Sequence, residues 1–160
     1  MKAFKTEKQG SEAAASQFLA FQLGTETYGV PLLEVQEIRT YTLATPIPNT
    51  PEHVLGVINL RGAIIAVIDL RRRLGLPPIS DQEQTIFMVV TIGDKTYGLR
   101  ADSVSDVIEI NTDSIQEAPK VMDEEKQRFI SGLAQITDRV IVLLNLEQVI
   151  DIETVSKMAA

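Results

Sequence analysis

The sequence predicts a mainly β protein made of two five-stranded barrels, and three observations support this fold class. Short apolar runs follow one another closely and are separated by Gly and Pro, which is typical of all-β domains. The chain repeats its own pattern, so we expect two similar halves. Its 160 residues suit one domain, and a half of about 65–70 residues would be only marginally stable alone. We therefore expect the halves, about residues 17–80 and 81–150, to share a core.

The repeat is clearest where "FLAFQLGTETYGV" at residues 18–30 aligns with "FMVVTIGDKTYGL" at residues 87–99. Each segment begins with Phe, reaches a Gly six residues later, and ends in Thr-Tyr-Gly followed by an aliphatic residue. A second pair, "HVLGVINLRGAIIAVIDL" and "FISGLAQITDRVIVLLNL", matches after an insertion near residues 111–128. A register kept over so many positions favours duplication over convergence of two unrelated hairpins.

Each copy should begin with a strand, a tight turn at Gly24 or Gly93, and a second strand. The next segment, "PLLEVQEI" or "ADSVSDVI", has apolar residues three positions apart, which predicts a short helical turn. These apolar residues are Leu32, Val35 and Ile38 in the first copy, and Val104 and Val107 in the second.

A long hairpin completes each copy, and one helical turn is expected to follow it. Asp69 and Asn145 are placed to accept amide hydrogens at the start of these turns, and Gly75 is placed to end the first. The amphipathic C-terminus predicts a helical segment over residues 151–160 that docks on the body. Residues 1–16 are polar and lack periodicity, which predicts a disordered tail.

The two hairpins differ at their tips. The second copy has a polar turn at Thr137-Asp138-Arg139, whereas the first has Arg61-Gly62. Gly62 provides a positive φ, and Arg61 is expected to project outward. Because both are competent turns, turn chemistry alone does not require the arginine, and any exposed residue would serve there.

Composition restricts the partners. The net charge of −7 argues against nucleic acid or anionic lipid, because both need a basic surface. No run reaches the roughly 18–20 uncharged apolar residues of a membrane span, so we expect no direct membrane insertion. The N-terminus has no apolar stretch of signal-peptide length, and the chain has no cysteine. Both features suit a cytoplasmic protein.

No catalytic, cofactor or metal site is predicted. His53 is the only histidine, so one chain cannot form a multi-histidine metal site, and we expect this residue to be a solvent-facing turn residue. No phosphate-binding glycine motif occurs, and Asp123-Glu124-Glu125 lacks the ligand spacing of a calcium loop. The protein is therefore not expected to be an enzyme. The arginines at residues 71–73 suit a solvated helical turn, or alternatively a basic patch for an acidic partner.

The segments "FLAFQLGTETYGVPLLEVQEIR" and "IPNTPEHVLGVINLRGAIIAVIDL", with the degenerate second copy, resemble the CheW family of bacterial chemotaxis coupling proteins. The resemblance covers about residues 17–150 and implies two SH3-like five-stranded barrels without catalytic activity. It implies a scaffold that links the cytoplasmic tip of methyl-accepting chemoreceptors to the regulatory domain of the histidine kinase CheA. Such a protein is cytoplasmic and is recruited to membrane receptor arrays through its partners.

The resemblance also implies contact residues. Those expected to bind the receptor are Val35, Glu37, Gly56, Arg61, Gly62, Val104 and Val107. Those expected to bind the kinase are Leu32 and Ile86, near the barrel ends. A receptor tip is a helical bundle, so an apolar groove rimmed by a few charges would suit it. Val35 and Val107 would line the groove, Glu37 and Arg61 would set orientation, and Gly56 would permit close approach.

Two other functions stay open from the sequence. One is a coupling protein of a chemotaxis-like pathway, such as a pili-linked one. The other is a small β module that binds a ligand or peptide in the cleft between the barrels.

Overall fold

The computed structural model describes residues 15–78, 84–120, 123–151 and 154–155. The elements of the first half are β1 (Ala15–Leu23), β2 (Glu26–Pro31), the 3-10 turn η1 (Leu32–Glu34), β3 (Val35–Thr40), β4 (Val54–Leu60), β5 (Ala63–Asp69) and α1 (Leu70–Arg73). Those of the second half are β6 (Ile86–Ile92), β7 (Lys95–Ala101), β8 (Ser103–Asn111), η2 (Thr112–Ser114), α2 (Glu124–Gln127), β9 (Ile130–Ile136), β10 (Arg139–Leu144) and α3 (Leu146–Ile150). Most of the predicted N-terminal tail lies outside the described residues, and its last two positions begin β1.

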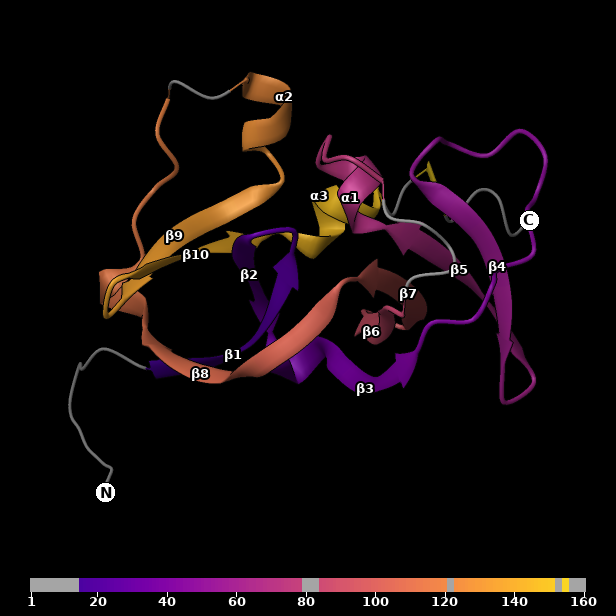
Figure 1. Cartoon of the computed structure of the whole chain (residues 1–160), viewed down its shortest axis with the longest axis horizontal. Coiled ribbons are helices and arrows are strands. Elements are labelled where there is room, and N and C mark those ends of the chain that lie inside the picture. The colour runs from indigo at the N-terminus through magenta and orange to yellow at the C-terminus, as the bar shows by residue number, and fades with distance from the viewer. Residues whose placement is uncertain (1–14, 79–83, 121–122, 152–153, 156–160) are drawn as a thin grey trace.

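The strands form two five-stranded sheets, which lie next to each other in Figure 1. Sheet A has the order β8-β1-β2-β10-β9, and sheet B has the order β3-β6-β7-β5-β4. The prediction of a mainly β fold with two five-stranded units is confirmed. The prediction that each unit is a closed, SH3-like barrel is not, because neither sheet closes by strand pairing within the described residues.

Each sheet takes strands from both halves of the chain. The β1–β2 hairpin of the first half pairs through β2 with β10 of the second, and β5 of the first half pairs with β7 of the second. Both of these pairings are parallel, whereas the hairpins are antiparallel. The expected boundary near residue 80 therefore separates the two repeats in sequence, but it does not separate the sheets.

The main hydrophobic core lies between the two sheets. Its fully buried residues come from both halves and include Phe21, Ile68, Met88, Leu99 and Val149. Burying these large side chains against one another stabilises both sheets at once. Neither half could keep this apolar surface from water alone.

The helical turns predicted over residues 31–38 and 101–108 are wrong. Only η1 is helical, and the rest of these segments forms the edge strands β3 and β8. A β-bulge explains the misleading spacing in each case, because an extra residue in one strand interrupts the alternation of its side chains. The register of β3 shifts between Val35 and Glu37, and that of β8 shifts where Phe21 pairs with Val104.

The predicted turns and caps are confirmed. Gly24 and Gly93 have φ values of 65° and 64°, which suit glycine in a tight turn. The Asp69 side chain accepts a hydrogen bond from the Arg71 amide at 3.0 Å, and the Asn145 side chain accepts one from the Gln148 amide at 3.4 Å. Each cap thus begins the helical turn that follows a long hairpin.

The C-terminal helix is interrupted. α3 ends at Ile150, and the φ of 60° places the next residue, Asp151, in the left-handed region. Of the segment predicted to be helical, 151–160, the structure describes only residues 151 and 154–155. Val155 is buried in the main core, as a docked C-terminus requires.

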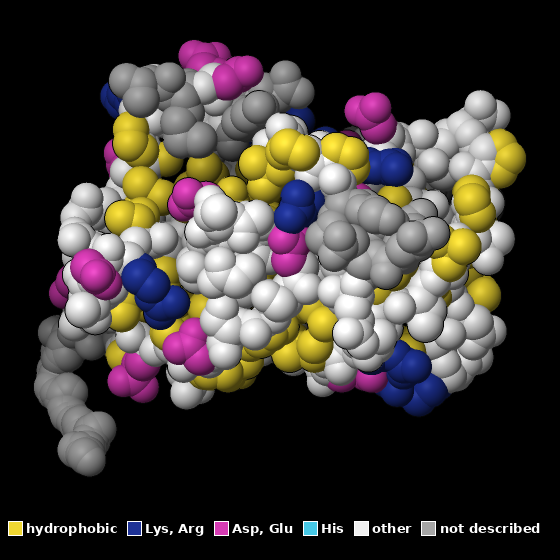
Figure 2. Space-filling model, viewed as in Figure 1, with side chains coloured by type: hydrophobic (Ala, Val, Ile, Leu, Met, Phe, Trp, Pro, Cys, Tyr) yellow, Lys and Arg dark blue, Asp and Glu magenta, His cyan; other side chains and the backbone are white. Residues whose placement is uncertain are grey.

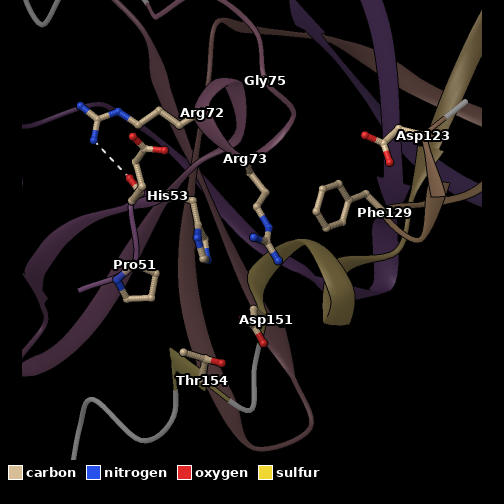
Figure 3. A pocket seen from close by; sticks show the side chains of 10 residues that line it. Pro51, His53, Arg72, Arg73, Gly75, Asp123, Phe129, Asp151 and Thr154 are labelled. Carbon is tan, nitrogen blue, oxygen red and sulfur yellow. Dashed lines mark hydrogen bonds between the residues drawn. The ribbon is translucent and has the colours of Figure 1, made fainter. Parts of the chain in front are cut away.

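His53 is not the solvent-facing residue that the sequence predicts. The residue is 6% exposed, and its Nε2 lies 3.2 Å from the carbonyl oxygen of Ile150. Its ring packs beside Arg73 at one wall of a cavity of about 500 Å³ (Figure 3). Burial, together with the charge of Arg73, lowers the pKa of His53 below its ordinary value, despite opposing effects of Ile150 and Asp151.

Two of the three consecutive arginines, Arg71 and Arg73, connect the two halves of the chain. Arg71 pairs with Asp102, and Arg73 donates hydrogen bonds to the carbonyl oxygens of Gln148 and Val149. Arg72 lies 3.7 Å from the Asp69 carboxylate. The side chains of Arg71 and Arg73 therefore stabilise contacts with the second half of the chain, and the expected solvated turn is wrong for these two.

We expect His53→Gln to reduce the loss of stability of the protein in mild acid. The unfolded chain protonates its histidine near pH 6.5, whereas the folded chain resists protonation, so folding free energy is lost as pH falls below about 6.5. Glutamine keeps an amide donor for Ile150 and does not titrate. Urea unfolding midpoints at pH 7.5 and 5.5 measure the effect, and equal changes in wild type and variant would contradict it.

Candidate functional site

The candidate functional site is a surface formed by β3, β8 and the tip of the β4–β5 hairpin. Among the described residues, no group of three or more His, Cys, Asp or Glu side chains is arranged to hold a metal ion. No helix in the same ranges combines the length and apolar character that crossing a bilayer requires. Candidate contact residues must therefore be judged by where the strands place them.

The residues predicted to contact a receptor lie on three neighbouring elements. Val35 and Glu37 are on β3, Gly56 and the Arg61-Gly62 pair are on the β4–β5 hairpin, and Val104 and Val107 are on β8. In Figure 1, β8 and β3 follow one another along the lower side of the molecule, and the hairpin tip lies beyond β3. The fold thus places residues distant in sequence along one side.

Arg61 and Glu37 form an ion pair across sheet B. Both terminal guanidinium nitrogens of Arg61 donate to the Glu37 carboxylate, one of them at 3.4 Å. Arg39 approaches the same carboxylate at 3.5 Å. Because β3 and β4 are the two edges of this sheet, the pair connects edges that strand pairing leaves apart. Figure 2 shows basic and acidic side chains side by side at the lower right of the molecule.

The ion pair lowers the pKa of the Glu37 carboxyl group. The hydrogen bond from Arg61 lowers the pKa of Glu37, against an opposing effect of desolvation and with smaller help from Arg39. The same hydrogen bond raises the pKa of Arg61. Both groups are accessible to solvent and charged near neutral pH, so they can also meet charges on a partner.

The hairpin tip holds Arg61 in a backbone conformation that suits glycine or asparagine better. Arg61 has a φ of 51° and Gly62 a φ of 90°, so both central residues of the turn are left-handed. The Gly62 amide donates to the Asn59 side chain at 2.9 Å, which fixes the turn. The sequence predicts a positive φ only for Gly62. The turn therefore tolerates Arg61 and does not favour it.

Gly56 has an internal reason to be glycine. A Cβ atom at this position would lie 2.1 Å from the carbonyl oxygen of Thr45, and the φ of 145° also disfavours other residues. Thr45 and Val57 exchange backbone hydrogen bonds of 2.9 Å on this edge of β4. The close approach that Gly56 permits is thus to the protein's own loop.

The predicted valines differ in accessibility. Val35 and Val104 are partly buried and pack against the main core, whereas Val107 is 49% exposed. Sequence reasoning missed two exposed apolar residues near them, Leu33 in η1 and Ile38 in β3. Leu33 is 95% exposed, and no local pattern indicates this because the residue lies in an apolar run.

The residues predicted to contact a kinase lie in η1 and at the start of β6. Leu32 and Ile86 are both partly buried and pack against the main core. Ile86 pairs with Thr40 of β3 and Ala101 of β7. The core contacts therefore account for much of the apolar surface of these two side chains.

The CheW-like domain family matches residues 17–154 of this chain. The chain belongs to this family. It is 36% identical over 146 residues to the chemotaxis protein CheW of Klebsiella aerogenes, covering 91% of this chain and 88% of that protein. It is 36% identical over 157 residues to a probable CheW of Rhizobium etli, covering 98% of each. The crystal structure of the scaffolding protein TtCheW from Thermoanaerobacter tengcongensis superposes with a TM-score of 0.74 and 34% identity, over 82% of this chain and 90% of that chain.

We expect Gly56→Ala to destabilise this CheW-like domain by about 2–4 kcal/mol, because the Thr45 loop must move away from β4. Gly93→Ala is the matched control, since Gly93 has a positive φ but a Cβ added there would meet no atom within 4 Å. The control should cost only about 1 kcal/mol. Urea denaturation measures the free energy of unfolding of both variants. Equal decreases would show that the contact with Thr45 does not cause the destabilisation.

Proposed function

We propose that the chain is a non-enzymatic scaffold that couples methyl-accepting chemoreceptors to the histidine kinase CheA. Its membership of a family whose relatives are named chemotaxis proteins, and one a scaffolding protein, supports this role. The observation that carries it in this chain is the solvent-accessible Arg61–Glu37 pair beside exposed apolar residues. A scaffold acts through such surfaces, in the cytoplasm, and needs no cofactor.

The receptor would bind along β3, β8 and the β4–β5 tip. A helical hairpin presents an apolar stripe flanked by charges, and here Val107 and Ile38 supply exposed apolar area. Glu37 and Arg61 would orient the hairpin through charge. Val35, Val104 and Gly62 complete the proposed contact, and Gly56 supports it by keeping β4 in place.

The proposed contacts with the regulatory domain of CheA lie in η1 and at the start of β6, both next to β3. Leu32 and Ile86 remain the proposed contacts, and their packing against the core would give a rigid patch. Rigid patches lose little side-chain entropy on association.

A ligand-binding module is not favoured. The cavity beside His53 is lined by Arg72 and Arg73, whose guanidinium groups already bond to backbone carbonyls of the protein. A small anionic ligand would have to displace these contacts.

The test is a charge exchange across the Arg61–Glu37 pair, measured as affinity for a soluble fragment carrying a receptor signalling hairpin. Arg61→Glu and Glu37→Arg should each weaken binding about ten-fold or more. The double variant restores an ion pair within the protein but presents its charges to the receptor in reversed positions. Its affinity for the receptor hairpin should therefore remain low. Thermal midpoints should stay within about 2 °C of wild type for the double variant.

Arg139→Glu, at the tip of the β9–β10 hairpin, is the matched control and should bind like wild type. Full binding by Arg61→Glu would refute the proposed surface. Full recovery in the double variant would show that the pair acts only within the protein.

A further inference from the structure

Asp102 lies where the chain passes from one sheet to the other. β7 of sheet B ends at Ala101, and β8 of sheet A begins at Ser103. Asp102 is thus the whole connection between these two strands. Its conformation sets the direction in which β8 leaves sheet B.

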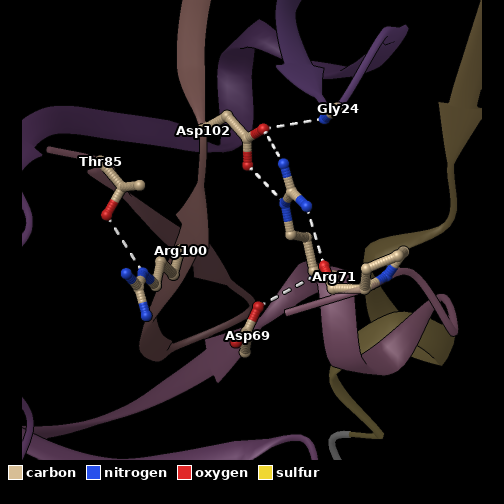
Figure 4. A network of polar contacts seen from close by, with 7 residues as sticks. Gly24, Asp69, Arg71, Thr85, Arg100 and Asp102 are labelled. Atoms are coloured by element: carbon tan, nitrogen blue, oxygen red, sulfur yellow. Dashed lines mark hydrogen bonds and ion pairs between the residues drawn. The ribbon is translucent and has the colours of Figure 1, made fainter. Parts of the chain in front are cut away.

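The Asp102 carboxylate is bound from both sheets (Figure 4). One oxygen accepts from Nε of Arg71 at 2.8 Å, and Arg71 lies in α1, directly after β5 of sheet B. The other accepts from the Gly24 amide at 2.8 Å, in the β1–β2 turn of sheet A, and also from Nη2 of Arg71. The Asp102 amide donates to the Gln22 carbonyl oxygen at 3.2 Å. We call the Arg71–Asp102–Gly24 contact the clasp.

The clasp is shielded from solvent. The side chains of Arg71 and Asp102 are only 15% and 18% exposed. Burial by itself would raise the pKa of Asp102, but the bonds from Arg71 and Gly24 hold it below its ordinary value. Asp102 therefore stays ionised, and a two-point contact with a guanidinium fixes geometry as well as charge.

The other crossover between the sheets lacks this contact. Aligning the two copies places Leu33 at the position of Asp102 and Glu147 at the position of Arg71. Leu33 is exposed, and the pKa of Glu34 beside it is raised by burial and by the negative charge of Glu147. The two repeats have the same strand order, but only one of the two equivalent crossovers has this contact. Strand pairing alone therefore does not require the clasp.

We propose that Arg71 and Asp102 are positioning residues that hold β8 at a fixed angle to β3. Val104 and Val107 follow Asp102 within the first five residues of β8, so a shift at this crossover moves them relative to Val35 and Glu37. The inference rests on the proposed function, because this two-strand surface is the proposed receptor surface. The clasp acts on binding without touching the receptor.

Spin labels test the geometry without any partner. The chain has no cysteine, so Thr40→Cys on β3 and Glu109→Cys on β8 give a uniquely labelled protein at two exposed positions. Pulsed electron resonance then reports the distance distribution between the strands.

Asp102→Asn should shift or broaden this distance distribution, whereas Asp94→Asn, in the exposed β6–β7 turn, should not. An unchanged distribution in Asp102→Asn would overturn the proposal. If Asp102→Asn does not fold, Arg71→Lys replaces it as the test variant. Lysine keeps the positive charge but cannot make the two-point contact with the Asp102 carboxylate.

Binding measurements test the consequence. Asp102→Asn should weaken affinity for the receptor hairpin about three- to ten-fold, as expected for a residue that acts through others. Affinity for the CheA regulatory domain should change by less than about two-fold, because the proposed kinase contacts are on η1 and β6, not on β8, and pack against the main core. Equal losses for both partners, or no loss for the receptor, would overturn the positioning role. If Arg61→Glu keeps full receptor affinity, the proposed receptor surface fails, and the distance distribution still decides whether the clasp fixes β8.

Discussion

Parallel pairing between the two repeats is the constraint on which the rest of this structure depends. β2 pairs with β10 and β5 pairs with β7, so each sheet is complete only when both copies contribute to it. This arrangement requires the chain to cross between the sheets twice, once at η1 and once at Asp102. Both crossovers lead directly into edge strands, β3 and β8, which are unpaired on their outer sides within the described residues. The proposed partner surface is therefore a consequence of how the repeats interlock.

Duplication produced equivalent positions, and the two copies now use them for different chemistry. Arg61 and Thr137 are both left-handed residues at hairpin tips, yet only Arg61 reaches across its sheet to a carboxylate. The two crossovers diverge in the same way, with the clasp at one and an exposed leucine at the other. An asymmetric binding surface from a symmetric scaffold needs such differences, because strand order alone would make the two sides alike.

Sequence patterns predict the local structure well where one residue type has one physical role. Gly24 and Gly93 in turns, and Asp69 and Asn145 as caps, are such cases, because each acts on its own neighbours. The patterns fail where a partner distant in sequence decides. His53 is buried next to Arg73 and contacts the carbonyl oxygen of Ile150, and Arg71 pairs with Asp102. These partners are far apart in sequence, so no local pattern predicts the contacts. The β-bulges in β3 and β8 imitate helical spacing, and only the register of the neighbouring strand reveals them. The candidate site combines both kinds of feature: Arg61-Gly62 is visible as an odd turn, but its link to Glu37 requires the curvature of sheet B.

The Arg61–Glu37 pair and the clasp restrain different strands of the proposed surface. The pair connects the two edges of sheet B, and so fixes β3 relative to the β4–β5 tip. The clasp fixes β8 where it leaves sheet B. The pair is accessible to solvent and can exchange its partner for a charge on another protein, since exposed pairs contribute little to folding. The clasp is shielded and has no such freedom. The proposed surface thus combines one rigid strand with one strand held by an exchangeable ion pair, and such a surface would accept a helical partner without losing its shape.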